Sequence, residues 1–275
     1  MDYGKIIASL PYILECEHME VPERFAGKVS LYKICYESDN CRVMGYISVP
    51  LDFDGELPVI IYNRGGNRDF GALQPAAVCR YAAYGAVCLG SQYRGNMGGT
   101  GLEQFGGDDV NDVIRLIDIG LSIPFSVKSG IYMIGHSRGG MMTYRACAID
   151  DRIKAAVVGA GMSDCFIMYE IREDEMKQVF HELVGGGPTE KYDEFVFRSA
   201  TYWADKIKPP MLLCQGTNDW RVVPEQTYKM YEKLKTAGKD VELIIYEGAE
   251  HDLRPTSFGD DAVKWLFEHK LQGRN

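Results

Sequence analysis

The segment Ile131–Gly140 reads Ile-Tyr-Met-Ile-Gly-His-Ser-Arg-Gly-Gly, an apolar run that ends in a glycine-rich turn. A short apolar run of this kind is typical of a buried strand, and Met141–Ala148 after the turn has the pattern of a helix. Gly-x-Ser-x-Gly between a strand and a helix is typical of a nucleophile elbow, in which a strained turn projects the serine side chain above the sheet. The alternative is an ordinary turn with a capping serine, but the flanking strand and helix favour Ser137 as a nucleophile.

The rest of the chain alternates short apolar runs with helical patterns, which is typical of a wound α/β sheet. Between residues 161 and 200 the alternation stops, and this predicts a small helical cap inserted into a single domain of residues 1–275. The predicted strands are 28–36, 42–49, 57–62, 86–89, 131–134, 155–158, 211–214 and 241–246. The predicted helices cover 72–83, a segment opened by Asp108 and Asp109, 141–148 and 260–271.

Composition and charge exclude several classes of protein. Hydrophobic residues make up 46% of the 275 and charged residues 25%, which is the balance of a globular protein and not of a disordered chain. Lys and Arg total 30 against 39 Asp and Glu, a net charge of −9, so we expect no binding to nucleic acid or to an anionic membrane. The N-terminus lacks a signal-peptide pattern and no apolar stretch is long enough to span a membrane, so we expect a cytoplasmic protein.

The sequence contains no complete motif for a metal or a cofactor. The eight cysteines are scattered without a Cys-x-x-Cys pair, which predicts buried free thiols in a reducing compartment. His181-Glu182 begins like the zinc motif His-Glu-x-x-His, but Gly185 stands where the second histidine would be. No glycine-rich phosphate loop or dinucleotide fingerprint is complete either. We therefore expect that the protein needs no cofactor and no metal.

A serine nucleophile needs a base and an acid that orients the base. Of the five histidines, His251 follows the last predicted strand, where a wound sheet gathers its site, although a surface histidine is the alternative. Asp219 follows the preceding strand, so the order Ser137, Asp219, His251 matches the order of these groups in α/β hydrolases. A turn or capping role for Asp219 is the alternative. Asp252 adjoins His251 and would struggle to reach that ring, and Asp240 precedes the last strand, at the wrong end of the sheet.

An oxyanion that forms during attack on a carbonyl group is usually held by backbone N–H groups. One should come from the residue after the nucleophile, Arg138, and the other from the loop after the third strand, Asn63-Arg64-Gly65-Gly66-Asn67. Gly65 or Arg64 is the predicted donor in that loop, because the paired glycines allow the chain to turn close to the substrate oxygen. A purely structural turn is the alternative.

Five motifs are distributed over residues 40–270: Tyr93-Arg94-Gly95, Phe105–Val113, Gly135–Gly140, Asp219–Pro224 and Glu250-His251. Together they resemble the catalytic domain of the prolyl oligopeptidase family of serine peptidases. The resemblance implies an α/β-hydrolase fold, with a mostly parallel central sheet flanked by helices. It also implies a triad of Ser137, Asp219 and His251, and hydrolysis of short peptides or related acyl compounds.

Three features differ from the family pattern: the N-terminal region, the loop Asn63–Gly66 and Arg138. Members usually carry an N-terminal β-propeller, whereas the first predicted strand here begins at residue 28, so we expect no propeller. Relatives without a propeller include carboxylesterases and deacetylases. The second feature is Asn63–Gly66, which stands where the family often has His-Gly-Gly or Tyr-Gly-Gly. The backbone donor can survive this change, but a tyrosine hydroxyl donor would have to come from Tyr62 or Tyr93.

Substrate contacts are predicted at two places. Arg138 stands where several relatives have a tyrosine, and Arg138, Arg64 or Arg68 could make the mouth of the site basic and favour a carboxylate on the substrate. Arginines packed structurally beneath the loop are the alternative. The predicted cap supplies apolar side chains that could wall an acyl or proline pocket or form the cap's own core, namely Phe166, Met168 and Tyr169, together with Cys165, Phe180, Tyr192 and Phe195.

These observations predict a serine hydrolase that works through an acyl-enzyme, with a short peptide or another small molecule as its substrate. A peptidase similar to prolyl oligopeptidase is the first hypothesis, and a carboxylesterase or deacetylase acting on small acyl esters is the second. A catalytically idle α/β-hydrolase fold used for binding is the third, although the complete set of Ser137, Asp219 and His251 argues against it. An oligomer is possible, but nothing in the sequence supports one.

Overall fold

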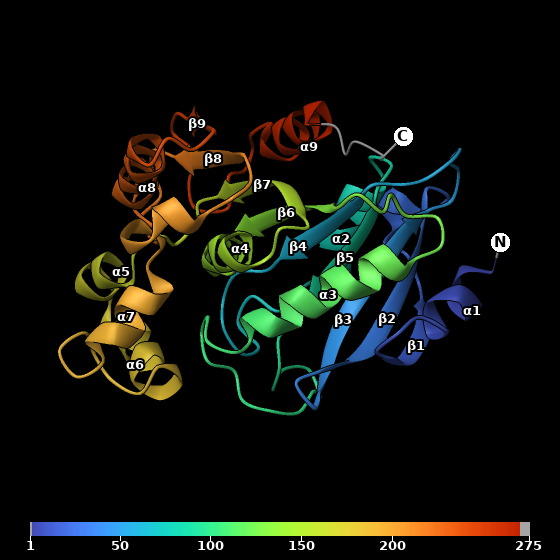
Figure 1. Ribbon diagram of the computed structural model, residues 1–275, viewed down its shortest axis with the longest axis horizontal. Helices are drawn as coiled ribbons and strands as arrows, with labels where there is room; N and C mark the ends of the chain where they lie inside the picture. Colours follow the sequence, from blue (N-terminus) through green and yellow to red (C-terminus); the bar gives the residue numbers. More distant parts are fainter. Residues whose placement is uncertain (1, 270–275) are drawn as a thin grey trace.

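The structure is a computed structural model that describes residues 2–269, and its nine described strands form one sheet (Figure 1). The order across the sheet is β1-β2-β3-β5-β4-β6-β7-β8-β9. Strand bounds are β1 Ile13–Met19, β2 Val29–Ser38, β3 Cys41–Pro50, β4 Val59–Asn63, β5 Val87–Ser91, β6 Ile131–His136, β7 Ile153–Gly159, β8 Met211–Gly216 and β9 Val241–Tyr246.

The six strands from β5 to β9 in this order pair in parallel, whereas β1, β2 and β3 form an antiparallel edge that joins the sheet at β5. This confirms the predicted α/β-hydrolase fold with its mostly parallel central sheet. Because parallel strands end at the same edge, the loops that follow β4, β5, β6, β8 and β9 meet there.

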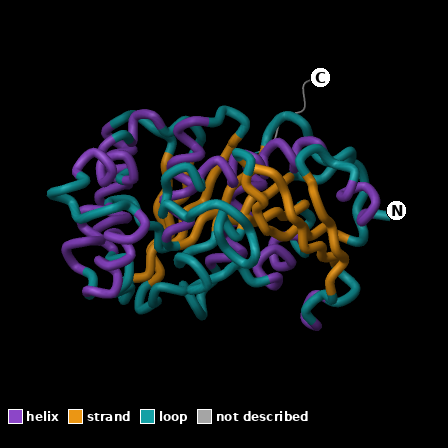
Figure 2. The backbone as a smooth tube through the Cα atoms, turned by 90° about the horizontal axis from the view of Figure 1, so that it is seen from below, coloured by secondary structure: helices purple, strands orange, loops and turns teal. Residues whose placement is uncertain are grey.

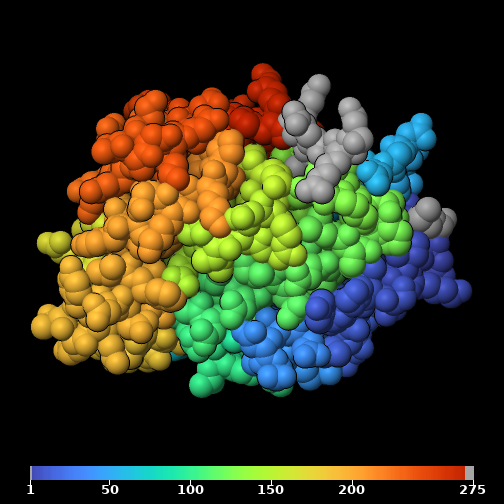
Figure 3. All heavy atoms as spheres, in the orientation of Figure 1, coloured from blue at the N-terminus to red at the C-terminus, as the bar shows by residue number. Residues whose placement is uncertain are grey.

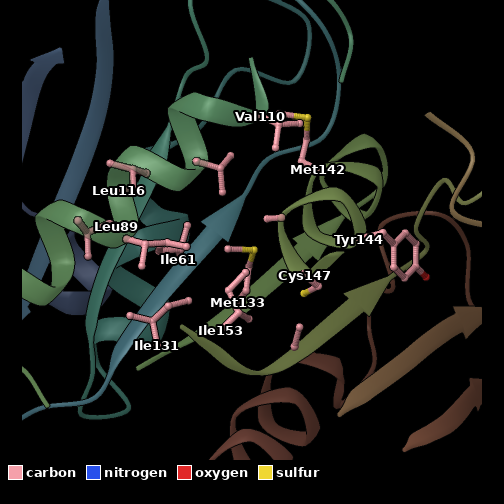
Figure 4. Close-up of a cluster of buried hydrophobic side chains, with 14 of the residues drawn as sticks. Ile61, Leu89, Val110, Leu116, Ile131, Met133, Met142, Tyr144, Cys147 and Ile153 are labelled. Atoms are coloured by element: carbon pink, nitrogen blue, oxygen red, sulfur yellow. The ribbon is translucent and has the colours of Figure 1, made fainter. Parts of the chain in front are cut away.

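Helices cover both faces of the sheet, as the predicted fold requires. The face covered by α3, α4 and α8 holds one apolar core, part of which is shown in Figure 4, and the face covered by α2 and α9 holds a second. Helix bounds are α1 Tyr3–Ala8, α2 Pro75–Ala82, α3 Val110–Ser122, α4 Arg138–Ile149, α5 Cys165–Ile171, α6 Asp174–Leu183, α7 Tyr192–Arg198, α8 Pro224–Thr236 and α9 Phe258–Glu268.

Helix α3 illustrates how the sequence pattern forms these layers. Val110, Val113, Leu116 and Ile117 recur at helical spacing, so they lie on one face and are all buried against the sheet. Figure 4 shows Leu116 from this helix and Met142 from α4 among the side chains that fill the space above the strands. Burial of each such side chain contributes about 1.5–3 kcal/mol relative to its exposure.

The region of the predicted cap contains α5, α6 and α7, which follow β7 and lie at one end of the strand layer (Figures 1 and 2). In the view of Figure 3 this segment forms the lower left part of the molecule. Its aromatic side chains pack on one another, with Phe180 stacked on Phe195 at 5.0 Å between ring centroids. That residues 161–200 act as a cap over the site stays a prediction.

Several elements differ from their predicted bounds. Strand β1 was not predicted, because it lies at the sheet edge and its polar residues interrupt any apolar run. Helices α1 and α8 were not predicted either. Helix α2 begins at Pro75 and not at residue 72, since proline favours the first helical position. Helix α9 begins at Phe258, and residues 270 and 271 of the predicted helix lie outside the described residues.

Two further observations concern the whole described chain. Residues 2–269 contain no helix that combines the length and the apolar character needed to cross a membrane. All eight cysteines are free thiols, six of them buried and the other two, Cys16 and Cys41, half-buried.

Candidate active site

Ser137 occupies the sharp turn between β6 and α4. Its backbone angles are φ 59° and ψ −127°, a strained conformation for a residue with a side chain. The backbone of Gly139 lies so close to that of Asn63 that a Cβ atom added to Gly139 would stand 2.0 Å from the carbonyl oxygen of Asn63. Only glycine fits at that position, which explains the second glycine of the Gly-x-Ser-x-Gly motif.

The structure brings His251 and Asp219 to this serine from two other strand ends. His251 Nε2 lies 2.9 Å from Ser137 Oγ, and His251 Nδ1 lies 2.9 Å and 3.1 Å from the two carboxylate oxygens of Asp219. Asp219 follows β8 and His251 follows β9, so both reach the carboxyl edge of the sheet. A hydroxyl, an imidazole and a carboxylate in this order can abstract a proton from the serine and stabilise the resulting imidazolium.

The Asp219 carboxylate is buried and held by three further donors. Its Oδ1 accepts hydrogen bonds from the backbone N–H groups of Arg221, at 2.9 Å, and Val222, at 3.0 Å. Its Oδ2 accepts a hydrogen bond of 3.2 Å from the side-chain amide of Gln215. These donors fix the rotation of the carboxylate, so one oxygen always faces His251.

The predicted oxyanion donors lie on both sides of Ser137. The N–H of Arg138 is at the first position of α4, where no intrahelical acceptor exists. Gly65 lies directly against the nucleophile, because a Cβ atom added to it would stand 2.8 Å from Ser137 Cβ and 3.3 Å from Ser137 Oγ. Tyr93 does not aim its hydroxyl at this space but donates it to the carbonyl oxygen of Arg64, at 2.9 Å.

We expect Gly65→Ala to lower kcat by about 10²- to 10³-fold, the usual effect of losing one oxyanion donor. The added methyl group cannot coexist with Ser137 at 2.8 Å, so the loop and its N–H must move away from the nucleophile. Steady-state kinetics on an activated ester measures the change, with Gly4→Ala in helix α1 as the control. A Gly65→Ala enzyme with wild-type kcat would contradict the assignment of this donor.

The structure corrects the hypothesis that Arg64, Arg68 and Arg138 make the mouth of the site basic. Arg138 and Arg64 are 3% and 2% exposed and are packed beneath the loop, the alternative stated above. Arg68 is exposed but forms an ion pair with Glu182 of α6. Each of these charges is therefore offset by a carboxylate or buried, and none is free to bind a substrate.

A buried ion network explains why Arg138 and Arg64 are inside. Arg138 forms ion pairs with Glu103 and, at 2.5 Å, with Asp109, and it donates a hydrogen bond of 3.0 Å to the carbonyl oxygen of Gly66. Arg64 lies 3.9 Å from the same Glu103 carboxylate. Burial raises the pKa of Glu103, whereas the two arginines and its hydrogen bonds lower it. The lowering effects together are larger, so the pKa of Glu103 lies below its ordinary value.

The network ties the oxyanion loop to the loop that follows β5. Asp109 accepts hydrogen bonds from the backbone N–H of Gly106 and from Arg138, whereas the sequence reading placed it in the first turn of a helix. Glu103 and Asp109 were missed as site residues. No sequence signal identifies them, because their partner is fixed only when distant loops pack together.

We expect Arg138→Met to lower the free energy of unfolding by about 3–5 kcal/mol, because it leaves two carboxylates buried without their partner. Urea unfolding followed by fluorescence measures this change. Arg42→Met is the control, since Arg42 forms an exposed ion pair with Glu15 and should give no measurable change. Equal effects of the two substitutions would show that the network does not stabilise the fold.

Ser137 opens into a cavity of about 690 Å³. Its apolar lining residues include Phe105, Met162, Met168 and Met176. Among the three predicted contacts from the cap, Met168 thus lines the cavity.

Phe166 and Tyr169 do not line the cavity. The ring of Phe166 packs on Phe195 and Tyr202, and the Tyr169 hydroxyl lies 3.0 Å from His181 Nε2. Their prediction as substrate contacts is therefore corrected: both belong to the aromatic core of the cap segment, which was the stated alternative.

His136 also lines the cavity, beside the predicted base. Its Nε2 lies 2.8 Å from the carbonyl oxygen of His251, and the two rings are 5.1 Å apart. Burial and the neighbouring His251 lower the pKa of His136 to about 4, against a smaller opposite effect of Asp219 and Asp252. His136 is therefore neutral at neutral pH and adds no charge beside His251.

We expect stability to fall as the pH is lowered from about 6.5 to 4, by about 2 kcal/mol from His136 alone. In this range the unfolded state binds a proton at His136 that the folded state, with a pKa of about 4, does not bind. Urea unfolding at pH 7, 5.5 and 4.5 measures the slope. His136→Gln should flatten it, whereas His18→Gln on the exposed strand β1 should not, and identical slopes would contradict the assignment.

Within residues 2–269, no group of three or more His, Cys, Asp or Glu side chains is placed to hold a metal ion.

Comparisons with known proteins place the chain in a family. The family model described as the prolyl oligopeptidase family matches residues 83–269. Among curated proteins, the chain is similar to the uncharacterized peptidase YtmA of Bacillus subtilis, with 33% identity over 228 residues, which cover 82% of this chain and 88% of that protein. The chain spans about a third of the length of longer curated relatives.

Two solved structures illustrate the fold. An acylaminoacyl peptidase in complex with Z-Gly-Gly-Phe-chloromethyl ketone has a TM-score of 0.73 at 24% identity, covering 100% of this chain and 44% of that one. An acetyl xylan esterase from Paenibacillus sp. R4 has a TM-score of 0.72 at 20% identity, covering 97% of this chain and 92% of that one. At these identities the likeness shows a shared α/β-hydrolase fold.

Proposed function

This chain belongs to the prolyl oligopeptidase family of hydrolases, and we propose that it is a serine peptidase that cleaves short peptides through an acyl-enzyme at Ser137. The observation that carries the proposal is the hydrogen-bonded series from Ser137 Oγ through His251 to Asp219, at the wall of a cavity. The similarity to a curated peptidase over 82% of the chain supports the choice of a peptide substrate.

In the proposed mechanism Ser137 Oγ attacks the carbonyl carbon of the substrate while His251 Nε2 takes the hydroxyl proton. Asp219 accepts a hydrogen bond from the Nδ1–H group of His251, which selects the tautomer with a free Nε2 and stabilises the imidazolium. The imidazolium then gives its proton to the leaving group, and an acyl-enzyme remains on Ser137. Water repeats the attack with His251 again as the base, which releases the acyl product and restores the serine.

The negative charge of each tetrahedral intermediate is held by the backbone N–H groups of Arg138 and Gly65 in this proposal. Arg138 is at the positive end of α4, which favours an anion. The buried network beneath both residues positions them: Arg138 binds the carbonyl oxygen of Gly66, and Arg64 binds that of Gly65 at 3.0 Å. Arg64 therefore acts as a positioning residue, not as the donor itself.

The same geometry can serve an ester carbonyl group, so a carboxylesterase or deacetylase is the second candidate. An assay that compares an ester with an amide of the same acyl group distinguishes the two candidate functions. Suitable substrates are p-nitrophenyl esters on one side and aminoacyl and dipeptidyl p-nitroanilides, including Xaa-Pro, on the other. We expect cleavage of both in the wild type and of neither in Ser137→Ala.

Each outcome of this assay selects one function. Serine-dependent cleavage of the amides at rates comparable to the esters supports the peptidase. Rapid ester turnover with no amide cleavage would replace the peptidase by the esterase. No turnover, together with no labelling of Ser137 by a fluorophosphonate, would leave a binding protein with an α/β-hydrolase fold.

A further inference from the structure

The cavity beside Ser137 is positively charged, although the chain as a whole has a net charge of −9. Within residues 2–269, seven arginines but only three carboxylates contribute to its lining. A cavity lined with one sign of charge attracts ligands of the opposite sign. Only an arginine whose charge is not already offset by a neighbouring carboxylate is available to such a ligand.

Three of the seven arginines have a carboxylate partner, and a fourth, Arg221, lies over an aromatic ring. Arg64 and Arg138 are held by the buried carboxylates of the network described above. Arg172 forms an ion pair with Glu173 at 2.5 Å. Arg221 lies over an aromatic ring beside it, with 5.3 Å between the guanidinium carbon and the ring centroid.

Arg24, Arg80 and Arg254, like Arg221, form no ion pair with any residue of the described chain, and Arg24 lies over the ring of Phe25 at 4.7 Å. Arg24 and Arg254 are exposed and Arg80 is half-buried, and one carboxylate, Asp252, lines the cavity near them. Three guanidinium groups against one carboxylate leave a net positive charge. Arginine in such a place is suited to a carboxylate or a phosphate, since it presents parallel N–H donors.

These arginines converge from distant parts of the chain. Arg24 comes from the short 3-10 helix η1 (Glu23–Phe25), Arg80 from α2 and Arg254 from the loop after β9. Arg80 and Arg254 line the cavity together with Tyr62, and their charges oppose the rise that burial causes in the pKa of the Tyr62 hydroxyl, to about 12. Tyr62 packs on Tyr81 at 5.4 Å between ring centroids, and both line the cavity.

Arg254 and the base His251 belong to the same loop after β9, which associates the cluster with the leaving-group side of Ser137. In a serine hydrolase the base gives its proton to the leaving group, which must therefore lie on the side of the histidine. Arg254 is three residues after His251 on the same loop, and Asp252 lies between them in the sequence. The apolar side chains that also line the cavity, among them Met162 and Met168, are left for the acyl group.

We propose that Arg24, Arg80 and Arg254 form a subsite for an anionic leaving group, one that bears a carboxylate or a phosphate. The subsite rests on the proposed hydrolase chemistry at Ser137 and defines its substrate class. A short peptide with a free C-terminal carboxylate just beyond the scissile bond meets this requirement.

The test compares two esters with the same acetyl group, 4-acetoxybenzoate and its methyl ester, which differ in one negative charge on the leaving group. We expect Arg80→Gln and Arg254→Gln each to lower the ratio of the two kcat/KM values, anionic over neutral, by about tenfold. The variant that combines both with Arg24→Gln should lose the discrimination and its dependence on ionic strength. Arg42→Gln is the matched control, because it removes the same charge from an exposed ion pair away from the cavity.

Binding to Ser137→Ala tests the subsite without turnover. Calorimetry with benzoate and with phenyl phosphate should show binding of at least one anion, and the tighter ligand identifies the anion. Adding Arg80→Gln and Arg254→Gln to Ser137→Ala should weaken that binding by tenfold or more, whereas adding Arg42→Gln should not.

The two proposals can fail separately. An unchanged ratio in Arg80→Gln and Arg254→Gln, an equal change in Arg42→Gln, or binding of neither anion would overturn the subsite. In each of these cases, serine-dependent cleavage of the neutral ester would still support the hydrolase. Arginine-dependent anion binding to Ser137→Ala, with no turnover of either ester by the wild type, would support the anion site and overturn the proposed function.

Discussion

Replacing Ser137 by alanine is expected to lower kcat by about 10⁶-fold on any substrate that the wild type cleaves. Without Oγ no acyl-enzyme can form, and His251 Nε2 loses the group that lies 2.9 Å from it. The rate that remains is that of water attacking a substrate bound beside the oxyanion donors. Single-turnover and steady-state kinetics measure the loss, and mass spectrometry after fluorophosphonate treatment should find no adduct.

Two variants make this result specific. Ser257→Ala removes an exposed hydroxyl that donates a hydrogen bond to Asp261 outside the site, and this substitution should leave kcat unchanged. Ser137→Ala combined with His251→Ala should be no slower than Ser137→Ala alone, because groups that act as a unit are not additive. Substantial activity in Ser137→Ala, or labelling at another serine, would refute the assignment of the nucleophile.

Replacing Asp219 by asparagine is expected to lower kcat by about 10⁴-fold while the fold is retained. Oδ1 of Asp219 accepts two backbone N–H groups, from Arg221 and Val222, so the amide oxygen of the asparagine must remain there. The amide NH₂ group then faces His251 Nδ1. Because an NH₂ group only donates hydrogen bonds, Nδ1 must be the unprotonated nitrogen that accepts one. The imidazole must carry its proton on Nε2, and it can no longer take the proton from Ser137.

The kinetics of Asp219→Asn are measured against Asp240→Asn. Asp240 precedes β9, at the opposite edge of the sheet, and its substitution should leave kcat unchanged. Circular dichroism and urea unfolding should confirm that Asp219→Asn is folded. A folded Asp219→Asn protein that keeps more than about a tenth of the wild-type kcat would show that Asp219 does not orient the base.

Local patterns were sufficient to predict the frame of the site. A strand, a Gly-x-Ser-x-Gly turn and a helix are contiguous in the sequence, so the placement of Ser137 between β6 and α4 needed no knowledge of distant contacts. Parallel strands end at one edge, which is why side chains after β8 and β9 were expected beside Ser137. The structure brings Asp219 and His251 into hydrogen-bond distance there, and the two variants above test their roles.

Predictions for side chains without a local signal were less successful. Phe166 and Tyr169 were expected at the substrate, but apolar side chains at helical spacing can face either a pocket or the core of their own segment. Only the packing of α5 against α6 and α7 decides between the two. Strand β1 was missed for a related reason, since an edge strand can be polar and is stabilised by pairing with β2.

The sequence by itself determined most of the strands and helices of the parallel part of the sheet, the elbow at Ser137, and the strand ends from which the base and the acid come. These follow from periodicity and glycine geometry, which act over a few residues. The tertiary structure decided which arginines are offset by carboxylates. Arg138 meets Glu103, 35 residues earlier, inside the protein, whereas Arg80 and Arg254 meet at the cavity wall with no carboxylate paired to either within the described chain. Charges have no preferred sequence spacing, so their partners are set by the packing of distant loops and by the cost of burying an unpaired charge.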